Sequence, residues 1–168
     1  MYLIFGLGNP GKEYEKTYHN MGFLAIDLLA DDLGVKLCKS GLKSKYAESH
    51  FDKEKVILIK PQTYMNNSGE SVLLWKKKYK DAKILVFVDD IDLPKGDVRY
   101  RLHGSAGTHN GLRSIVSYIG SEFERIKIGI GRGEGDLKDF VLSKVDESFV
   151  KDALAKAVET CKNIIKQA

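Results

Sequence analysis

Six polar side chains in this 168-residue chain are of the types that transfer a proton or hold a carbonyl group. They are Asn9, His19, Asn66, Asp92, His109 and Asn110. A histidine has an unperturbed pKa of about 6.5 and can take a proton from water, and an acid facing it can hold its tautomer. Amides both donate and accept hydrogen bonds, which suits a carbonyl flanked by N–H groups. Brought together, these residues would support proton transfer beside a carbonyl.

Three of these residues follow apolar runs that are typical of buried strands. Asn9 comes after residues 2–7, Asn66 after residues 56–59 and Asp92 after residues 83–88. In open α/β sheets, ligands bind at the edge formed by the carboxyl ends of the strands. We therefore predict that these loops converge on one site, with His109 and Asn110 delivered by the start of a further helix.

The remaining pattern predicts a single domain over residues 1–168, an α/β/α sandwich around a central mixed, mostly parallel twisted sheet. Further strands are expected over residues 45–51 and 55–60 as a hairpin, 97–102 at an edge, and 125–130. Helices are expected over residues 20–34, 68–80 and 110–119 and from about residue 148, with a loop over 36–42.

Composition excludes several classes of protein. The net charge of +4 is too small to establish a nucleic-acid partner, although Arg99 and Arg101 form a local basic cluster. The two cysteines lie far apart and no residues have metal-ligand spacing, so we expect a reduced compartment and no metal. Neither a signal peptide nor an apolar run of spanning length is present, which favours the cytoplasm.

Simpler explanations exist for some of the candidates. The acids Asp89, Asp90 and Asp92 could suggest Mg²⁺, but they do not follow the pattern of a calcium loop, and Asp89 and Asp90 can be turn-forming acids. His19 can equally be a capping or exposed residue. The segment Gly6–Gly11 matches G-x-G-x-x-G, but Pro10 removes an N–H and no helix follows at once, so we reject a dinucleotide site.

Six motifs, in order, resemble the bacterial peptidyl-tRNA hydrolase family. They are G-L-G-N-P-G-x-x-Y (6–14), T-x-H-N-x-G (17–22), P-x-T-Y-M-N-x-S-G (61–69), D-x-D-L-P-x-G (90–96), G-x-H-N-G-L (107–112) and R-I-x-I-G-I-G-R (125–132). The resemblance implies hydrolysis of the ester between a peptide and the 3′ ribose of tRNA, by a cytoplasmic monomer that needs no cofactor.

The resemblance also implies roles for individual residues. His19 would be the general base, Asp92 would hold its ring, and Asn9 would read the peptide side of the ester. The acceptor end and its ester would be bound by Tyr14, Tyr64, Asn66 and Asn110, with Met65 in the same substrate-binding group. His109 would lie on the substrate side or support a residue that does. Arg99, Arg101 and Arg132 would lie near the tRNA backbone, but Arg99 and Arg101 could instead be ordinary exposed charges of an edge strand. The chain departs from the family in having Tyr64 where phenylalanine is more usual, and in the loops around residues 105–108 and 133–135. An RNA-binding module that uses the same cleft without chemistry is the alternative.

Overall fold

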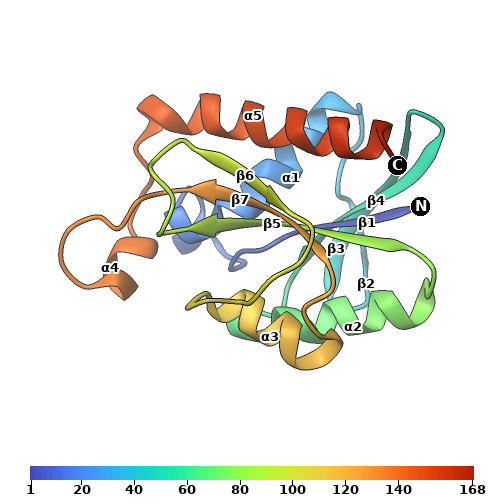
Figure 1. Ribbon diagram of the computed structural model, residues 1–168, viewed down its shortest axis with the longest axis horizontal. Coiled ribbons are helices and arrows are strands. Elements are labelled where there is room, and N and C mark those ends of the chain that lie inside the picture. The colour runs from blue at the N-terminus through green and yellow to red at the C-terminus, as the bar shows by residue number, and fades with distance from the viewer.

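The computed structural model describes residues 1–168 (Figure 1). The continuous apolar runs of the sequence form the central strands of its sheet. The central strands are parallel: β4 (Glu54–Pro61), β1 (Tyr2–Gly6), β5 (Lys83–Asp90) and β7 (Glu124–Gly129). The outer strands β3 (Ser44–Phe51), β2 (Lys39–Gly41) and β6 (Val98–Arg101) run antiparallel to their neighbours. The order is β2-β3-β4-β1-β5-β7-β6. The predicted mixed sheet, the hairpin and the edge strand are therefore confirmed.

The sheet differs from the prediction in two details. Its adjacent strand pairs divide evenly, three parallel and three antiparallel, so only the centre is parallel throughout. Residues 36–42 were expected to be a loop, but Lys39–Gly41 pair with Ser44–Tyr46 as β2. A three-residue strand is too short to show an alternating pattern, and Leu42 and Lys43 make its tight turn with positive φ.

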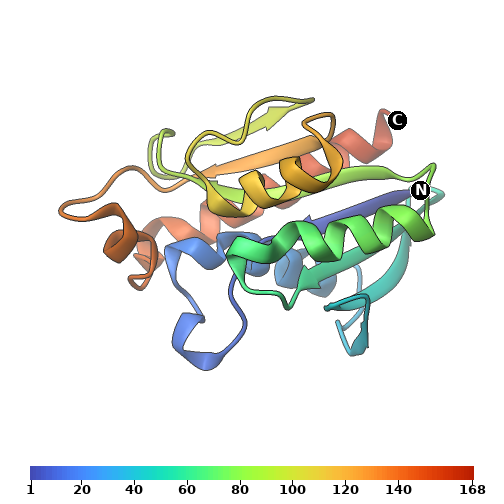
Figure 2. The same cartoon turned by 90° about the horizontal axis from the view of Figure 1, so that it is seen from below.

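Two helices cover each face of the sheet, as the predicted sandwich requires (Figures 1 and 2). One face packs on α1 (Met21–Asp32) and α5 (Glu147–Lys166), and the other on α2 (Ser68–Lys78) and α3 (Asn110–Ile119). A short helix α4 (Leu137–Val141) and three 3₁₀ turns, η1 (Lys12–Tyr14), η2 (Tyr18–Asn20) and η3 (Met65–Asn67), complete the chain. None of the helices has the length and apolar character that crossing a membrane requires.

The alternation of side chains along β5 decides what its carboxyl end presents. Leu85 and Phe87 lie in the core beneath α1 and α5, whereas Val86 and Val88 lie in the core beneath α2 and α3. Because successive side chains point to opposite faces, Asp89 follows Leu85 and Phe87 onto the α1 side. An acid therefore emerges where α1 begins.

Gly22 allows α1 to press against the ends of two strands. A Cβ at this position would lie 2.4 Å from the Leu7 nitrogen and 2.6 Å from the Phe87 carbonyl oxygen. Both neighbours are backbone atoms of the sheet, so relief would require the helix to shift. Gly22→Ala should therefore destabilise the fold by about 1–3 kcal/mol, as overpacking does.

Urea unfolding would measure this effect. The control is Gly41→Ala, whose added Cβ would lie 3.5 Å from its nearest neighbour, an ordinary contact. We expect its midpoint to stay near that of the unmodified protein. Equal midpoints for both variants would contradict the close approach of α1 to the sheet.

Candidate active site

A cleft of about 670 Å³ opens at the carboxyl ends of the central strands. Nine of the residues selected from the sequence line it: Asn9, Tyr14, His19, Tyr64, Met65, Asn66, Asp92, His109 and Asn110. Arg99, Arg101 and Arg132 lie outside the cleft lining. The predicted convergence of loops from distant parts of the chain is thus realised.

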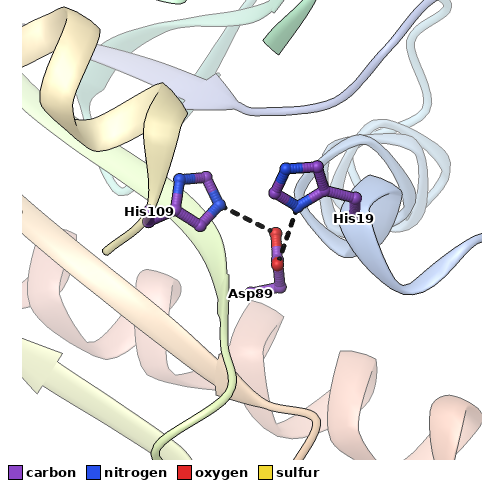
Figure 3. Close-up of side chains that lie close together, drawn as sticks. All are labelled: His19, Asp89 and His109. Atoms are coloured by element: carbon purple, nitrogen blue, oxygen red, sulfur yellow. Dashed lines mark hydrogen bonds and ion pairs between the residues drawn. The ribbon is translucent and has the colours of Figure 1, made fainter. Parts of the chain in front are cut away.

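The centre of the cleft is a buried carboxylate between two imidazoles (Figure 3). Nδ1 of His19 lies 3.0 Å from Oδ2 of Asp89, and Nε2 of His109 lies 3.1 Å from Oδ1 of the same residue. The Asp89 side chain is 2% exposed, against 14% for His19 and 11% for His109. Each oxygen of one carboxylate thus serves one histidine.

The expected contact between Asp92 and His19 is wrong. Asp92 lies beyond the end of β5, is 61% exposed, and pairs with Arg132 at 2.5 Å. Asp89 takes the position beside His19 that was expected of Asp92, because Asp89 is still within β5 and faces α1. The sequence does carry a signal for this: Asp89 directly continues an apolar run, and an acid in a buried strand needs partners.

The surroundings of His109 determine its tautomer. Its Nδ1 accepts hydrogen bonds from the backbone nitrogens of Gly111 at 3.1 Å and Leu112 at 3.3 Å, so His109 caps the start of α3. An accepting Nδ1 carries no proton in the neutral ring, so Nε2 carries it and donates to Asp89. Both nitrogens of His109 are therefore engaged.

His19 differs because only one of its nitrogens is engaged. Nδ1 donates to Asp89, which leaves the Nε2 lone pair free to accept a proton in the cleft. Burial by itself lowers the pKa of His19, but the charge of Asp89 and its hydrogen bond outweigh burial and raise that pKa above the ordinary 6.5. The arrangement suits a general base that works at neutral pH.

Asp89 stays ionised in this buried position. Burial by itself raises the pKa of its carboxyl, but electrostatic attraction and hydrogen bonds from His19 and His109 hold that pKa below its usual range. The three side chains bring possible ligand atoms within 4.8 Å of one another. The two hydrogen bonds account for this proximity.

Asn9 connects the end of β1 to the loop after β4. Its Oδ1 accepts a hydrogen bond of 2.7 Å from the Met65 nitrogen. With the oxygen engaged, the Nδ2 group of Asn9 remains to donate into the cleft that Asn9 lines. Asn66 and Asn110, which are exposed at the same cleft, add further amides.

Two tyrosines form an aromatic edge of the cleft. Tyr14 and Tyr64 meet edge to face with centroids 6.4 Å apart, and Tyr64 is 53% exposed. Tyr64 also has a φ of 62° and a ψ of 157°, a strained combination that non-glycine residues rarely adopt and that tends to cluster at functional sites. This edge offers a surface on which a base can stack.

Basic residues gather beside the cleft on the α3 face of the sheet. Ile126 and Ile128 of β7 face the opposite core, so Lys127 between them points to the α3 side. In the β6–β7 ladder Arg99 lies opposite Lys127, and Arg101 lies opposite Arg125. Cross-strand partners share a face. Lys127 lines the cleft and was missed from the sequence, because a lysine in a strand pattern looks like an ordinary edge charge.

The rejection of a dinucleotide site agrees with the geometry. Gly6–Gly11 leads into the 3₁₀ turn η1, and the first α-helix begins only at Met21. No helix N-terminus therefore stands behind these glycines to receive a pyrophosphate.

Comparison with known proteins places the chain among enzymes. A family model described as peptidyl-tRNA hydrolase matches residues 3–168. The peptidyl-tRNA hydrolase of Thermoanaerobacter sp. (strain X514) is 46% identical over 172 residues, covering 99% of this chain and 94% of that protein. The protein of the same name from Finegoldia magna is 51% identical over 148 residues, covering 86% of this chain and 78% of that one.

Solved structures agree with the sequence relatives. The crystal structure of peptidyl-tRNA hydrolase from Acinetobacter baumannii superposes with a TM-score of 0.89 at 36% identity, covering 99% of this chain and 89% of that one. The match extends over the whole sheet and all the loops that build the cleft. This chain belongs to the peptidyl-tRNA hydrolase family.

Proposed function

We propose that this chain hydrolyses the ester between the peptide and the 3′ ribose of peptidyl-tRNA, with His19 as the general base for water. Membership of the family supports the activity, a carboxylic ester hydrolysis. The observation that carries the mechanism is the free Nε2 of His19, opposite the Nδ1 that donates to buried Asp89. Binding alone would need no histidine held in this way.

The proposed reaction moves one proton out and back. The water oxygen attacks the ester carbonyl carbon while Nε2 of His19 takes a water proton. The imidazolium that forms is stabilised by the Asp89 carboxylate. The tetrahedral intermediate then releases the 3′ oxygen of the ribose, which receives the proton from His19. The products are a free peptide carboxyl and a free tRNA.

The amides around His19 hold the substrate in this scheme. Asn9 donates Nδ2 to the peptide side of the ester, where a blocked aminoacyl group has a carbonyl that a free one lacks. Asn66 and Asn110 bind the acceptor end, and Tyr14 and Tyr64 stack against it. An enzyme that serves all tRNAs reads their shape and backbone rather than their sequence, so these contacts are with shared features.

We expect Arg99, Arg101 and Lys127 to bind phosphates of the tRNA backbone on the α3 side of the cleft, with Arg132 nearby. Arg101→Ala should weaken tRNA binding and reduce the slope of log affinity against log salt by about one, because one phosphate contact is lost. The value of kcat should stay unchanged, since Arg101 lies away from His19.

Binding titrations at several salt concentrations would measure this. The matched control is Lys77→Ala on α2, which removes the same charge from an exposed helix. An equal loss of affinity in both variants would indicate that net charge, and not the β6 edge, attracts the RNA.

The activity is tested by incubating the protein with N-acetylaminoacyl-tRNA and with unblocked aminoacyl-tRNA, and following release of free tRNA. Rapid cleavage of only the blocked ester is expected. Tight binding of tRNA without cleavage of either substrate would favour the RNA-binding module instead.

We further propose that the enzyme acts as a monomer in the cytoplasm, where it recycles tRNA from prematurely released peptidyl-tRNA. The mass of the protein in solution at working concentration tests whether it is a monomer.

A further inference from the structure

We infer that Asn20 is a positioning residue that aims Asn9 at the substrate and so determines how well blocked and unblocked aminoacyl-tRNA are distinguished. The inference rests on the proposed role of Asn9 as the group that reads the peptide side of the ester. It concerns a residue that is not itself part of the cleft lining and takes no part in proton transfer.

Asn20 holds the backbone of Asn9 from both sides. Its Oδ1 accepts from the Asn9 nitrogen at 2.8 Å, and its Nδ2 donates to the Asn9 carbonyl oxygen at 2.9 Å. Both residues are buried, Asn20 at 4% exposed and Asn9 at 9%. The two hydrogen bonds resemble the pair that facing residues exchange in an antiparallel sheet, with the amide of Asn20 in place of a second backbone. Together they fix both the position and the direction of the Asn9 backbone.

The side chain of Asn20 binds Asn9 instead of capping its own helix. Asn20 occupies the N-cap position of α1, where asparagine commonly accepts from its own helix, yet it makes no side-chain cap bond. Asn9, for its part, lies outside every helix and strand, so its buried N–H and C=O would otherwise lack partners. The asparagine at this N-cap position therefore stabilises the loop after β1 and not the first turn of α1.

Asn20 thereby couples three parts of the cleft. It directly follows His19 in η2, it holds Asn9 after β1, and Asn9 in turn holds the Met65 nitrogen after β4 through its own Oδ1. Since that bond leaves only Nδ2 of Asn9 for the substrate, the direction of Nδ2 is set by the backbone that Asn20 grips. Loosening Asn20 should therefore affect the contact with the peptide carbonyl before it affects His19.

A purely structural role would lower stability and reduce cleavage of both substrates alike. A positioning role instead predicts a selective loss. Asn20→Ala should lower kcat/KM for N-acetylaminoacyl-tRNA by about tenfold, the effect of one hydrogen bond, while the slow cleavage of unblocked aminoacyl-tRNA stays the same. Asn20→Asp should behave similarly, because it keeps an acceptor for the Asn9 nitrogen but sets a second oxygen against the Asn9 carbonyl.

The experiment is a double-mutant cycle on the ratio of the two kcat/KM values, with Asn9→Ala, Asn20→Ala and the double variant. Asn9→Ala should lower the ratio about tenfold or more, and adding Asn20→Ala to it should change the ratio no further. The pH dependence of kcat/KM should be the same in all variants, because His19 and Asp89 are untouched. Ser71→Ala is the control, since it removes another buried side-chain bond, 2.8 Å long, to the Leu42 carbonyl oxygen far from the cleft.

The outcomes separate the inference from the proposed function. If Asn9→Ala leaves the ratio unchanged, the proposed role of Asn9 fails. If Asn9→Ala lowers the ratio but Asn20→Ala and Asn20→Asp do not, the role of Asn9 stands and the inference about Asn20 is overturned. Equal losses on both substrates, additive losses in the cycle, or a shifted pH profile would each show that Asn20 acts through general structure or through His19, and would also overturn it.

Discussion

Replacing His19 by alanine should lower kcat by about two to four orders of magnitude, the contribution of a general base. That corresponds to roughly 3–5 kcal/mol of transition-state stabilisation. The affinity for tRNA should stay unchanged, since the residues proposed to hold the RNA lie on the α3 side and at the cleft edge. Single-turnover hydrolysis of N-acetylaminoacyl-tRNA, with a separate binding titration, measures both quantities.

His50→Ala is the control for this variant. His50 is an exposed histidine on β3, far from the carboxyl edge of the sheet. We expect its kinetics to match those of the unmodified protein. Full activity in His19→Ala would remove His19 from the mechanism, and loss of tRNA binding together with turnover would indicate that the substitution disturbs the fold of η2.

Replacing Asp89 by asparagine should cost at least about a hundredfold in kcat/KM, although the side chain keeps its shape. The two imidazoles both donate to Asp89, but an amide offers one acceptor and one donor group. His109 cannot change tautomer without breaking its bonds from Gly111 and Leu112. The amide oxygen must therefore face His109, and the NH₂ group must face His19.

This forces a change of tautomer in His19. An NH₂ group facing Nδ1 requires Nδ1 to accept, so the proton moves to Nε2, the atom that has to take a proton from water. The base is then lost although every side chain remains in place. Activity in Asp89→Asn equal to that of the unmodified protein would contradict the hydrogen-bond pattern described for the cleft. Asp92→Asn is the matched control, and we expect little effect because Asp92 pairs with exposed Arg132.

The pH profile adds a test of sign. Only neutral His19 can act as base, so kcat/KM should fall as the pH drops through a pKa that Asp89 raises above 6.5. Asp89→Asn removes the charge and leaves burial, which lowers the pKa of His19. The acidic limb of any residual activity should therefore move to lower pH. Hydrolysis rates between pH 5 and 9 would record this shift, and a shift to higher pH would contradict it.

The sequence by itself determined most of the architecture and the majority of the cleft. Apolar runs and helix patterns are local properties, so the sandwich, the hairpin, the edge strand and the four long helices could be predicted from them, whereas the short α4 was not. Asn9 and Asn66 could be placed at the cleft because polar residues at strand ends share the carboxyl edge of the sheet. His19 and Asn110 were expected at the same site from their positions before or at the start of a helix. The order of six motifs by itself also indicated the family.

Only the tertiary structure decided which acid serves His19. Asp89 continues the apolar run over residues 83–88 and Asp92 follows only three residues later, but the sequence does not mark where the strand ends. The length of β5 and its alternation bury Asp89 beneath α1, while Asp92 lies in solvent and pairs with Arg132. The grip of Asn20 on Asn9 and the fixed tautomer of His109 were likewise out of reach of the sequence, because hydrogen bonds between distant segments form only once packing has brought those segments together.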